Sequence, residues 1–135
     1  MIKSQEYKPM KNKILIVEDD LSTVELLKVT LELEGYEVAI AYDGIDALRK
    51  VEREKPNLIV LDVMIPGVDG FEVCQLLKHN LKFMKIPIIM VTAKVRKEDR
   101  ATGLEKGADD YITKPFEPAA LVDRIRKFIA REKVA

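Results

Sequence analysis

Five residues of this sequence carry side chains suited to binding a metal ion and transferring a charged group. They are three acids, a hydroxyl and an ammonium: Glu18, Asp19, Asp62, Thr92 and Lys114. Each stands at or just beyond the end of a short predicted strand. In an open parallel sheet the residues that follow the strands gather along one edge, so these five are expected to meet.

Three acids in one place require a compensating cation. Two carboxylates about 4 Å apart repel each other by about 4 kcal/mol at an effective dielectric constant of 20. Ligands that are all oxygen atoms favour a hard ion, and a site with few protein ligands favours Mg²⁺. A carboxylate bound to that metal can receive a phosphoryl group, with Lys114 neutralising and Thr92 hydrogen-bonding the transferred oxygens.

The elements that would position these residues alternate between strand and helix. Apolar runs and alternating patterns predict five strands, over 14–17, 36–42, 58–61, 86–91 and 110–113. Apolar residues at helical spacing predict a helix after each strand, the third of them over 71–81. Ser22 and Glu25 have the spacing of a capping box at the start of the first helix. Five strand–helix repeats predict an α/β protein with a parallel sheet and helices on both faces.

Length and composition narrow the class of protein. The chain has 135 residues, of which 47% are hydrophobic and 34% charged, as expected for one soluble globular domain. The 23 basic and 23 acidic residues cancel, which excludes a general attraction to nucleic acid or to a membrane surface. No apolar run approaches the roughly 20 residues that cross a bilayer, and residues 1–11 lack the apolar region of a signal peptide.

A single cysteine, Cys74, excludes a disulfide within the chain and fits a reducing compartment. We therefore expect a cytoplasmic protein with a flexible N-terminal extension over 1–11 and one folded domain over 12–132.

Four stretches of the sequence resemble the receiver domains of two-component response regulators. They are KILIVEDD at 13–20, LDVMIPGVDG at 61–70, VTA at 91–93 and GADDYITKPF at 107–116. Each is weak alone, but all four in this order and spacing are specific. The resemblance covers 13–131 and implies a flavodoxin-like (βα)₅ fold with strand order 2-1-3-4-5. It also implies a cis peptide bond between Lys114 and Pro115, a bond that proline makes accessible.

The resemblance implies roles for the acidic residues. Asp62 matches the aspartate that accepts a phosphoryl group from a sensor histidine kinase or phosphotransfer protein. Asp19 matches a direct Mg²⁺ ligand, Glu18 matches its acidic neighbour, and the backbone carbonyl of Met64 matches a further metal ligand. Asp20, by contrast, is expected to begin the first helix, where an acid complements the helix dipole.

The resemblance also implies a switch. Thr92 and Lys114 match the hydroxyl and lysine that bind the phosphoryl oxygens, and Tyr111 matches the aromatic residue that turns inward when Thr92 moves. The fourth helix, fifth strand and fifth helix would then present a changed surface to a downstream protein. Such a domain phosphorylates itself and is not an enzyme in the usual sense. Direct binding to nucleic acid or membrane is not implied, and a phosphorylation-dependent homodimer rests on family analogy alone.

The residues at two positions lack the side chains that would speed dephosphorylation. The family positions that tune this step correspond to Met64 and Lys94, and neither an apolar side chain nor a cation orients an attacking water molecule. We therefore expect slow autodephosphorylation, with a phosphoryl aspartate that persists for minutes or longer.

Other functions are less well supported by the residues. The starting Met1, the eleven-residue extension and the tail from Arg131 to Ala135 favour a free-standing regulator, but the sequence does not separate this form from the receiver part of a longer DNA-binding transcriptional regulator. An aspartyl-phosphate phosphohydrolase needs a second acid two residues after the nucleophile, where this chain has Met64. A flavin-binding module needs a phosphate-binding loop after the first strand, where this chain has acids.

Overall fold

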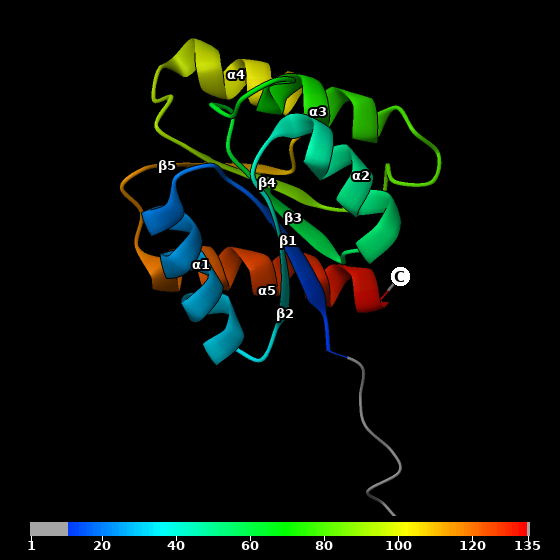
Figure 1. Ribbon diagram of the computed structural model, residues 1–135, viewed down its shortest axis with the longest axis vertical. Helices are drawn as coiled ribbons and strands as arrows, with labels where there is room; N and C mark the ends of the chain where they lie inside the picture. The colour runs from blue at the N-terminus through cyan, green and yellow to red at the C-terminus, as the bar shows by residue number, and fades with distance from the viewer. Residues whose placement is uncertain (1–10, 135) are drawn as a thin grey trace, which may run out of the picture.

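The computed structural model describes residues 11–134 and shows strands and helices in strict alternation (Figure 1). The strands are β1 (Lys13–Val17), β2 (Glu37–Ala41), β3 (Leu58–Leu61), β4 (Ile88–Thr92) and β5 (Asp110–Thr113). The helices are α1 (Leu21–Leu33), α2 (Gly44–Glu54), α3 (Gly70–Lys78), α4 (Lys97–Glu105) and α5 (Pro118–Val134). The predicted extension falls, except for residue 11, outside the described residues. Over 11–134 no helix is long and apolar enough to cross a membrane.

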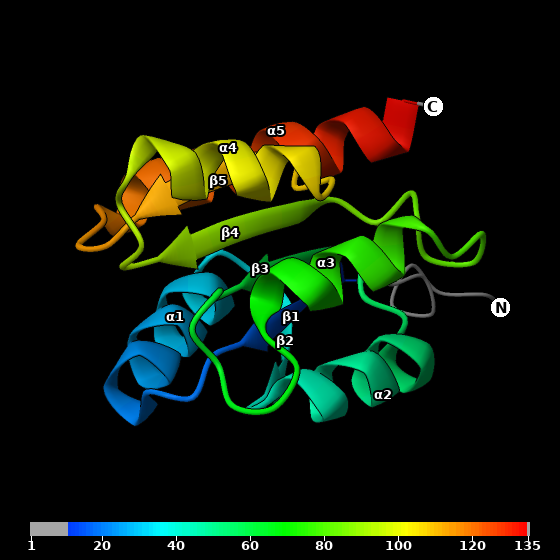
Figure 2. The same ribbon diagram turned by 90° about the horizontal axis from the view of Figure 1, so that it is seen from above.

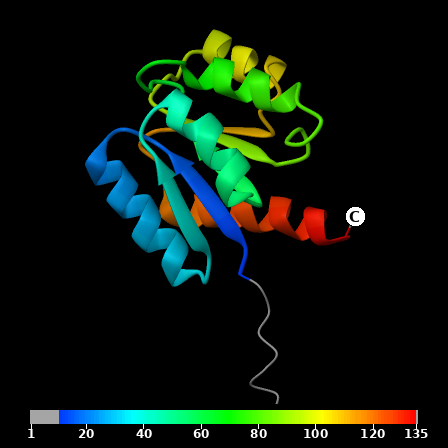
Figure 3. The same cartoon turned by 45° about the vertical axis from the view of Figure 1, so that its right-hand side comes forward.

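The strands form one parallel sheet in the order β2-β1-β3-β4-β5, which confirms the predicted fold class and strand order. Figure 3 shows β1 beside β2, and Figure 2 shows the arrowheads of β4 and β5 pointing the same way. The carboxyl ends of all five strands therefore open onto one edge of the sheet, as the position of the candidate residues requires.

Helices cover both faces of the sheet, with α1 and α5 on one side and α2, α3 and α4 on the other (Figure 1). Alternate side chains of β1 pack on opposite faces of the sheet. Leu15 and Val17 pack in the core under α2 and α3, whereas Ile14 and Ile16 pack in the core under α1 and α5. A strand buried on both faces needs apolar side chains at every position, which explains the uninterrupted apolar runs of β1 and β3.

The start of α1 differs from the prediction. The N-cap is Asp20, not Ser22: Asp20 has an extended backbone, and its carboxylate accepts hydrogen bonds from the Thr23 backbone at 2.9 Å and the Thr23 hydroxyl at 2.7 Å. The capping-box prediction was therefore wrong, and the expectation that Asp20 begins the helix is confirmed. An aspartate caps a helix as well as a serine does, so spacing alone could not choose between them.

β2 is one residue shorter at each end than predicted, and the start of β4 and the end of α3 also lie inside the predicted bounds. β4 begins at Ile88, since Pro87 has no N–H to donate to a neighbouring strand. α3 ends at Lys78, and His79 caps it, so the chain leaves the helix before Leu81.

We predict that Leu15→Ala destabilises the fold by about 2–5 kcal/mol, because it empties a fully buried position on a central strand. Leu81→Ala removes the same atoms from a side chain that is 90% exposed, and should change the free energy of unfolding by less than about 0.5 kcal/mol. Urea denaturation of both variants measures the difference. Equal midpoints for the two would contradict the described core.

Candidate functional site

The carboxyl edge of the sheet brings the predicted acids together. Carboxylate oxygens of Glu18, Asp19 and Asp62 all lie within 4.8 Å of one another. The Lys114 ammonium contacts two of these acids: its Nζ lies 2.6 Å from Glu18 Oε1 and 3.1 Å from Asp62 Oδ2. Four of the five residues singled out in the sequence are thus joined by direct contact or close approach.

Backbone hydrogen bonds place the two buried acids. Glu18 donates its N–H to Ala41 at 3.0 Å, and Asp62 donates its N–H to Val17 at 3.0 Å. These bonds continue the strand pairing by one residue beyond β1 and β3. Because β1 and β3 are neighbours, Glu18 and Asp62 emerge side by side.

A backbone hydrogen bond also fixes Lys114, which follows the edge strand β5. It follows β5, which pairs with β4, and its backbone N–H donates to the Thr92 carbonyl at 2.9 Å. The peptide bond between Lys114 and Pro115 is cis, as the resemblance implied. From this position the long lysine side chain spans β4 to reach the acids.

The acids differ in burial, and this sets the electrostatics of the site. Glu18 and Asp62 are 2% and 5% exposed, whereas Asp19 is exposed. Burial raises the pKa of Glu18, against the opposing effect of its bond from Lys114. Burial alone would lower the pKa of Lys114, but its bonds to Glu18 and Asp62 outweigh burial and the pKa is raised. The lysine therefore stays charged between the two acids.

The donor set fits a hard divalent cation. Three carboxylates supply only oxygen ligands, and the exposed Asp19 leaves one side of the cluster open to water, as Mg²⁺ requires. The backbone N–H of Met64 donates to Asp62 Oδ1 at 3.1 Å, so this residue borders the cluster. Its carbonyl as a metal ligand stays a prediction.

Thr92 and Tyr111 are connected through the backbone of Lys94. The Lys94 N–H donates to the buried Thr92 hydroxyl at 3.3 Å, and the Tyr111 hydroxyl donates to the Lys94 carbonyl at 2.8 Å. Tyr111 is 2% exposed, so its ring lies inward, and burial raises its pKa and keeps the hydroxyl protonated. Two hydrogen bonds, both to the backbone of Lys94, therefore connect Thr92 with Tyr111.

Two glycines that border the loop after β3, Gly44 and Gly70, were not singled out in the sequence. A Cβ on Gly70 would lie 2.3 Å from the carbonyl oxygen of Asp62, and a Cβ on Gly44 would lie 2.0 Å from that of Val68. Both glycines let helix N-termini press against the loop that follows β3. The Asp-Gly pairs at 43–44 and 69–70 were the available signal, but close approach to Asp62 is a tertiary contact.

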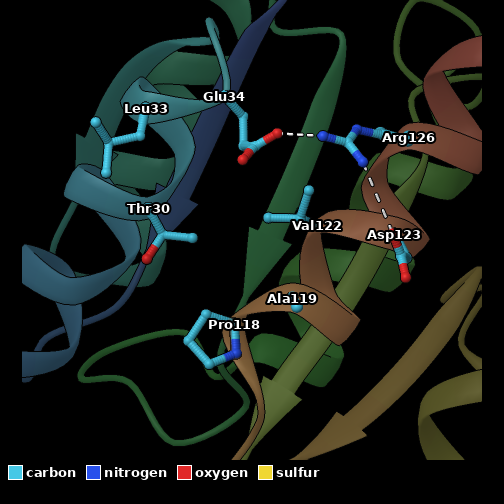
Figure 4. A pocket seen from close by; sticks show the side chains of 8 residues that line it. All are labelled: Thr30, Leu33, Glu34, Pro118, Ala119, Val122, Asp123 and Arg126. Atoms are coloured by element: carbon cyan, nitrogen blue, oxygen red, sulfur yellow. Dashed lines mark hydrogen bonds and ion pairs between the residues drawn. The ribbon is translucent and has the colours of Figure 1, made fainter.

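The groove between α1 and α5 is a separate feature (Figure 4). Glu34, which follows α1 as its C-cap, and Arg126 of α5 form an ion pair across it, and Arg126 also lies 3.8 Å from Asp123. None of the candidate site residues lines this groove. The ion pair links the end of α1 to α5, and the groove is not part of the acidic cluster.

Comparison with known proteins agrees with this geometry. A family model described as response regulator receiver domain matches residues 14–126. The chain is 51% identical over 127 residues to the alkaline phosphatase synthesis transcriptional regulatory protein PhoP of Bacillus subtilis, covering 93% of this chain and 52% of that protein. It is 44% identical over 122 residues to the DNA-binding response regulator MtrA of Mycolicibacterium paratuberculosis, covering 90% of this chain and 53% of that protein.

A solved structure gives the same result. The response regulator receiver domain protein (CheY-like) from Methanospirillum hungatei is 35% identical and superposes with a TM-score of 0.86, covering 93% of this chain and 100% of that one. The chain spans about half the length of the curated relatives named above. The sequence match, the strand order and the superposition agree: the chain belongs to the response regulator receiver domain family, whose role is in signalling and whose members typically use Mg²⁺.

Proposed function

We propose that Asp62 of this chain accepts a phosphoryl group from the phosphohistidine of a sensor histidine kinase or phosphotransfer protein. The observation that carries the proposal is the contact of Lys114 with both buried acids, beside a third carboxylate within 4.8 Å. This arrangement combines a nucleophile, a fixed cation and a set of metal ligands. Response regulator receivers interact with histidine kinases, which supplies the donor.

The transfer is an in-line displacement at phosphorus. A carboxylate oxygen of Asp62 forms the new O–P bond while the N–P bond to the donor histidine breaks, and the histidine nitrogen keeps the electron pair. Bound Mg²⁺ would offset the charge of the transferring oxygens, held by Glu18, Asp19 and Asp62. The Lys114 ammonium lies 3.1 Å from Asp62, close enough to pair with a phosphoryl oxygen on that side chain.

Thr92 would connect phosphorylation of Asp62 with a conformational change at the surface. Its hydroxyl, which now accepts from the Lys94 N–H, would turn to donate to a phosphoryl oxygen. The Lys94 peptide would then follow Thr92, and the Tyr111 hydroxyl is bonded to that same peptide. The population would shift toward a form with a changed surface over α4, β5 and α5.

The downstream target is a second part of the proposal. One relative is named as a transcriptional regulatory protein and the other as a DNA-binding response regulator, and the match covers about half of each, which supports the receiver part of a DNA-binding regulator over a free-standing form. In either form the surface of α4, β5 and α5 would contact a protein, with a phosphorylation-dependent homodimer as one such contact. A cytoplasmic location accords with phosphotransfer and with the single, buried Cys74.

Incubation with acetyl phosphate and Mg²⁺ should add one phosphoryl group to the wild type and none to Asp62→Asn, measured as intact mass. Asp69→Asn is the matched control, because Asp69 is an exposed helix cap outside the acidic cluster and should leave phosphorylation unchanged. Addition to Asp62→Asn would assign another acceptor. No addition to the wild type would mean that the domain requires its kinase or has lost the reaction.

Magnesium binding should depend on Asp19 and not on its neighbour Asp20. Asp19→Asn removes one ligand charge, and we expect a loss of Mg²⁺ affinity of about tenfold, or about 1.4 kcal/mol. Calorimetric titration with MgCl₂ measures this, and the rise of the thermal midpoint with Mg²⁺ gives an independent check. Asp20→Asn keeps the helix cap and should bind Mg²⁺ as the wild type does; equal losses in both variants would refute the assignment.

The phosphoryl group should persist for minutes or longer after acetyl phosphate is removed. Met64→Asn, which places a polar amide beside Asp62, should shorten the lifetime several-fold, because the amide can orient an attacking water molecule. Met84→Asn is the control, since Met84 is also partly exposed but lies in the turn after α3. Loss within seconds from the wild type would overturn this prediction.

A further inference from the structure

Gly103, on α4, faces the ring of Tyr111 at very short range. A Cβ on this glycine would lie 2.8 Å from Tyr111 Cδ2 and 3.0 Å from Cε2. It would also lie 2.9 Å from Met90 Sδ, on the strand that pairs with Tyr111. Gly103 is buried, and Tyr111 and Met90 belong to the same core cluster. The inward ring therefore occupies space that any other residue at position 103 would fill.

The ring cannot yield by a small displacement. Its hydroxyl is bonded to the Lys94 carbonyl, and the Tyr111 carbonyl accepts from Arg100 of α4 at 2.8 Å. The Arg100 guanidinium also lies 6.0 Å from the ring centroid, at the outer limit for a cation–π contact. With both ends of the residue held, an added methyl group must either move α4 away from β5 or turn the ring outward. Turning the ring outward would break the hydrogen bond between the Tyr111 hydroxyl and the Lys94 carbonyl.

We propose that Gly103 is a positioning residue of the switch: the missing side chain on α4 provides the niche that the inward Tyr111 ring requires. This inference rests on the proposed function, in which Tyr111 responds to phosphorylation of Asp62. It adds that α4 controls which position of the ring is allowed. The niche is a tertiary feature, because the glycine and the tyrosine come from different elements.

Gly103→Ala is the test, read out in two ways. Alanine is a better helix former than glycine, so the substitution should stabilise α4 if the niche were unimportant. In the wild-type background we expect instead a lower urea midpoint. In the Tyr111→Ala background the ring is gone, and Gly103→Ala should leave the midpoint unchanged or raise it. A lower urea midpoint in the wild-type background alone supports the niche. The same conclusion holds if Gly103→Ala fails to fold while the double variant with Tyr111→Ala folds.

The second readout follows the ring itself. In protein with ¹³C-labelled tyrosine, four ring signals are expected, and Tyr111→Phe identifies that of Tyr111. After acetyl phosphate and Mg²⁺, the wild type should show Tyr111 in its buried environment. Gly103→Ala should reach the same phosphorylated mass with the ring signal moved toward the solvent-exposed position, an effect that a purely structural role of the helix would not produce.

Two results would overturn the inference: equal loss of midpoint in both backgrounds, or an unchanged Tyr111 signal in Gly103→Ala. Failure of the proposed function looks different. In that case the wild type would gain no phosphoryl group on Asp62, whatever residue stands at position 103.

Discussion

The site depends on one electrostatic constraint: two buried carboxylates share a single ammonium. Glu18 and Asp62 are almost fully buried, and Lys114 lies within hydrogen-bond distance of both. Buried like charges without a partner would be strongly destabilising, because burial removes the water that would otherwise solvate them. The Lys114 ammonium offsets the charge of both carboxylates, and under the proposed function a metal ion and a phosphoryl group would change the balance of charge around it.

The parallel sheet makes this arrangement possible. Glu18 and Asp62 come from adjacent strands and meet at the carboxyl edge, whereas Lys114 comes from the edge strand and reaches across β4. The backbone bonds that extend the strand pairing by one residue fix all three side chains. Loops alone would not hold charged groups this firmly, since the cost of bringing the charges together must be offset by the rigid core beneath them.

A few contacts connect Thr92 at the site with helix α4 at the surface. Thr92 contacts the backbone of Lys94, the backbone of Lys94 contacts Tyr111, and Tyr111 packs against Gly103 of α4. Each step is a single hydrogen bond or van der Waals contact, and each residue is buried or half-buried. Packed cores adopt discrete arrangements more readily than gradual deformations, so a change at Thr92 would favour one of two arrangements of this chain of contacts.

Local sequence patterns were enough to predict the order of the elements and the parallel α/β class, and to nominate five polar residues for one edge of the sheet. Apolar runs report burial on two faces, and polar residues at the ends of such runs report the functional edge of the sheet. Contacts between residues far apart in the sequence became visible only in the folded structure. Lys114 bridges two acids, and glycines 44, 70 and 103 admit neighbouring elements at close range. Local patterns record each residue's own preference, whereas these contacts depend on where the fold places its partner.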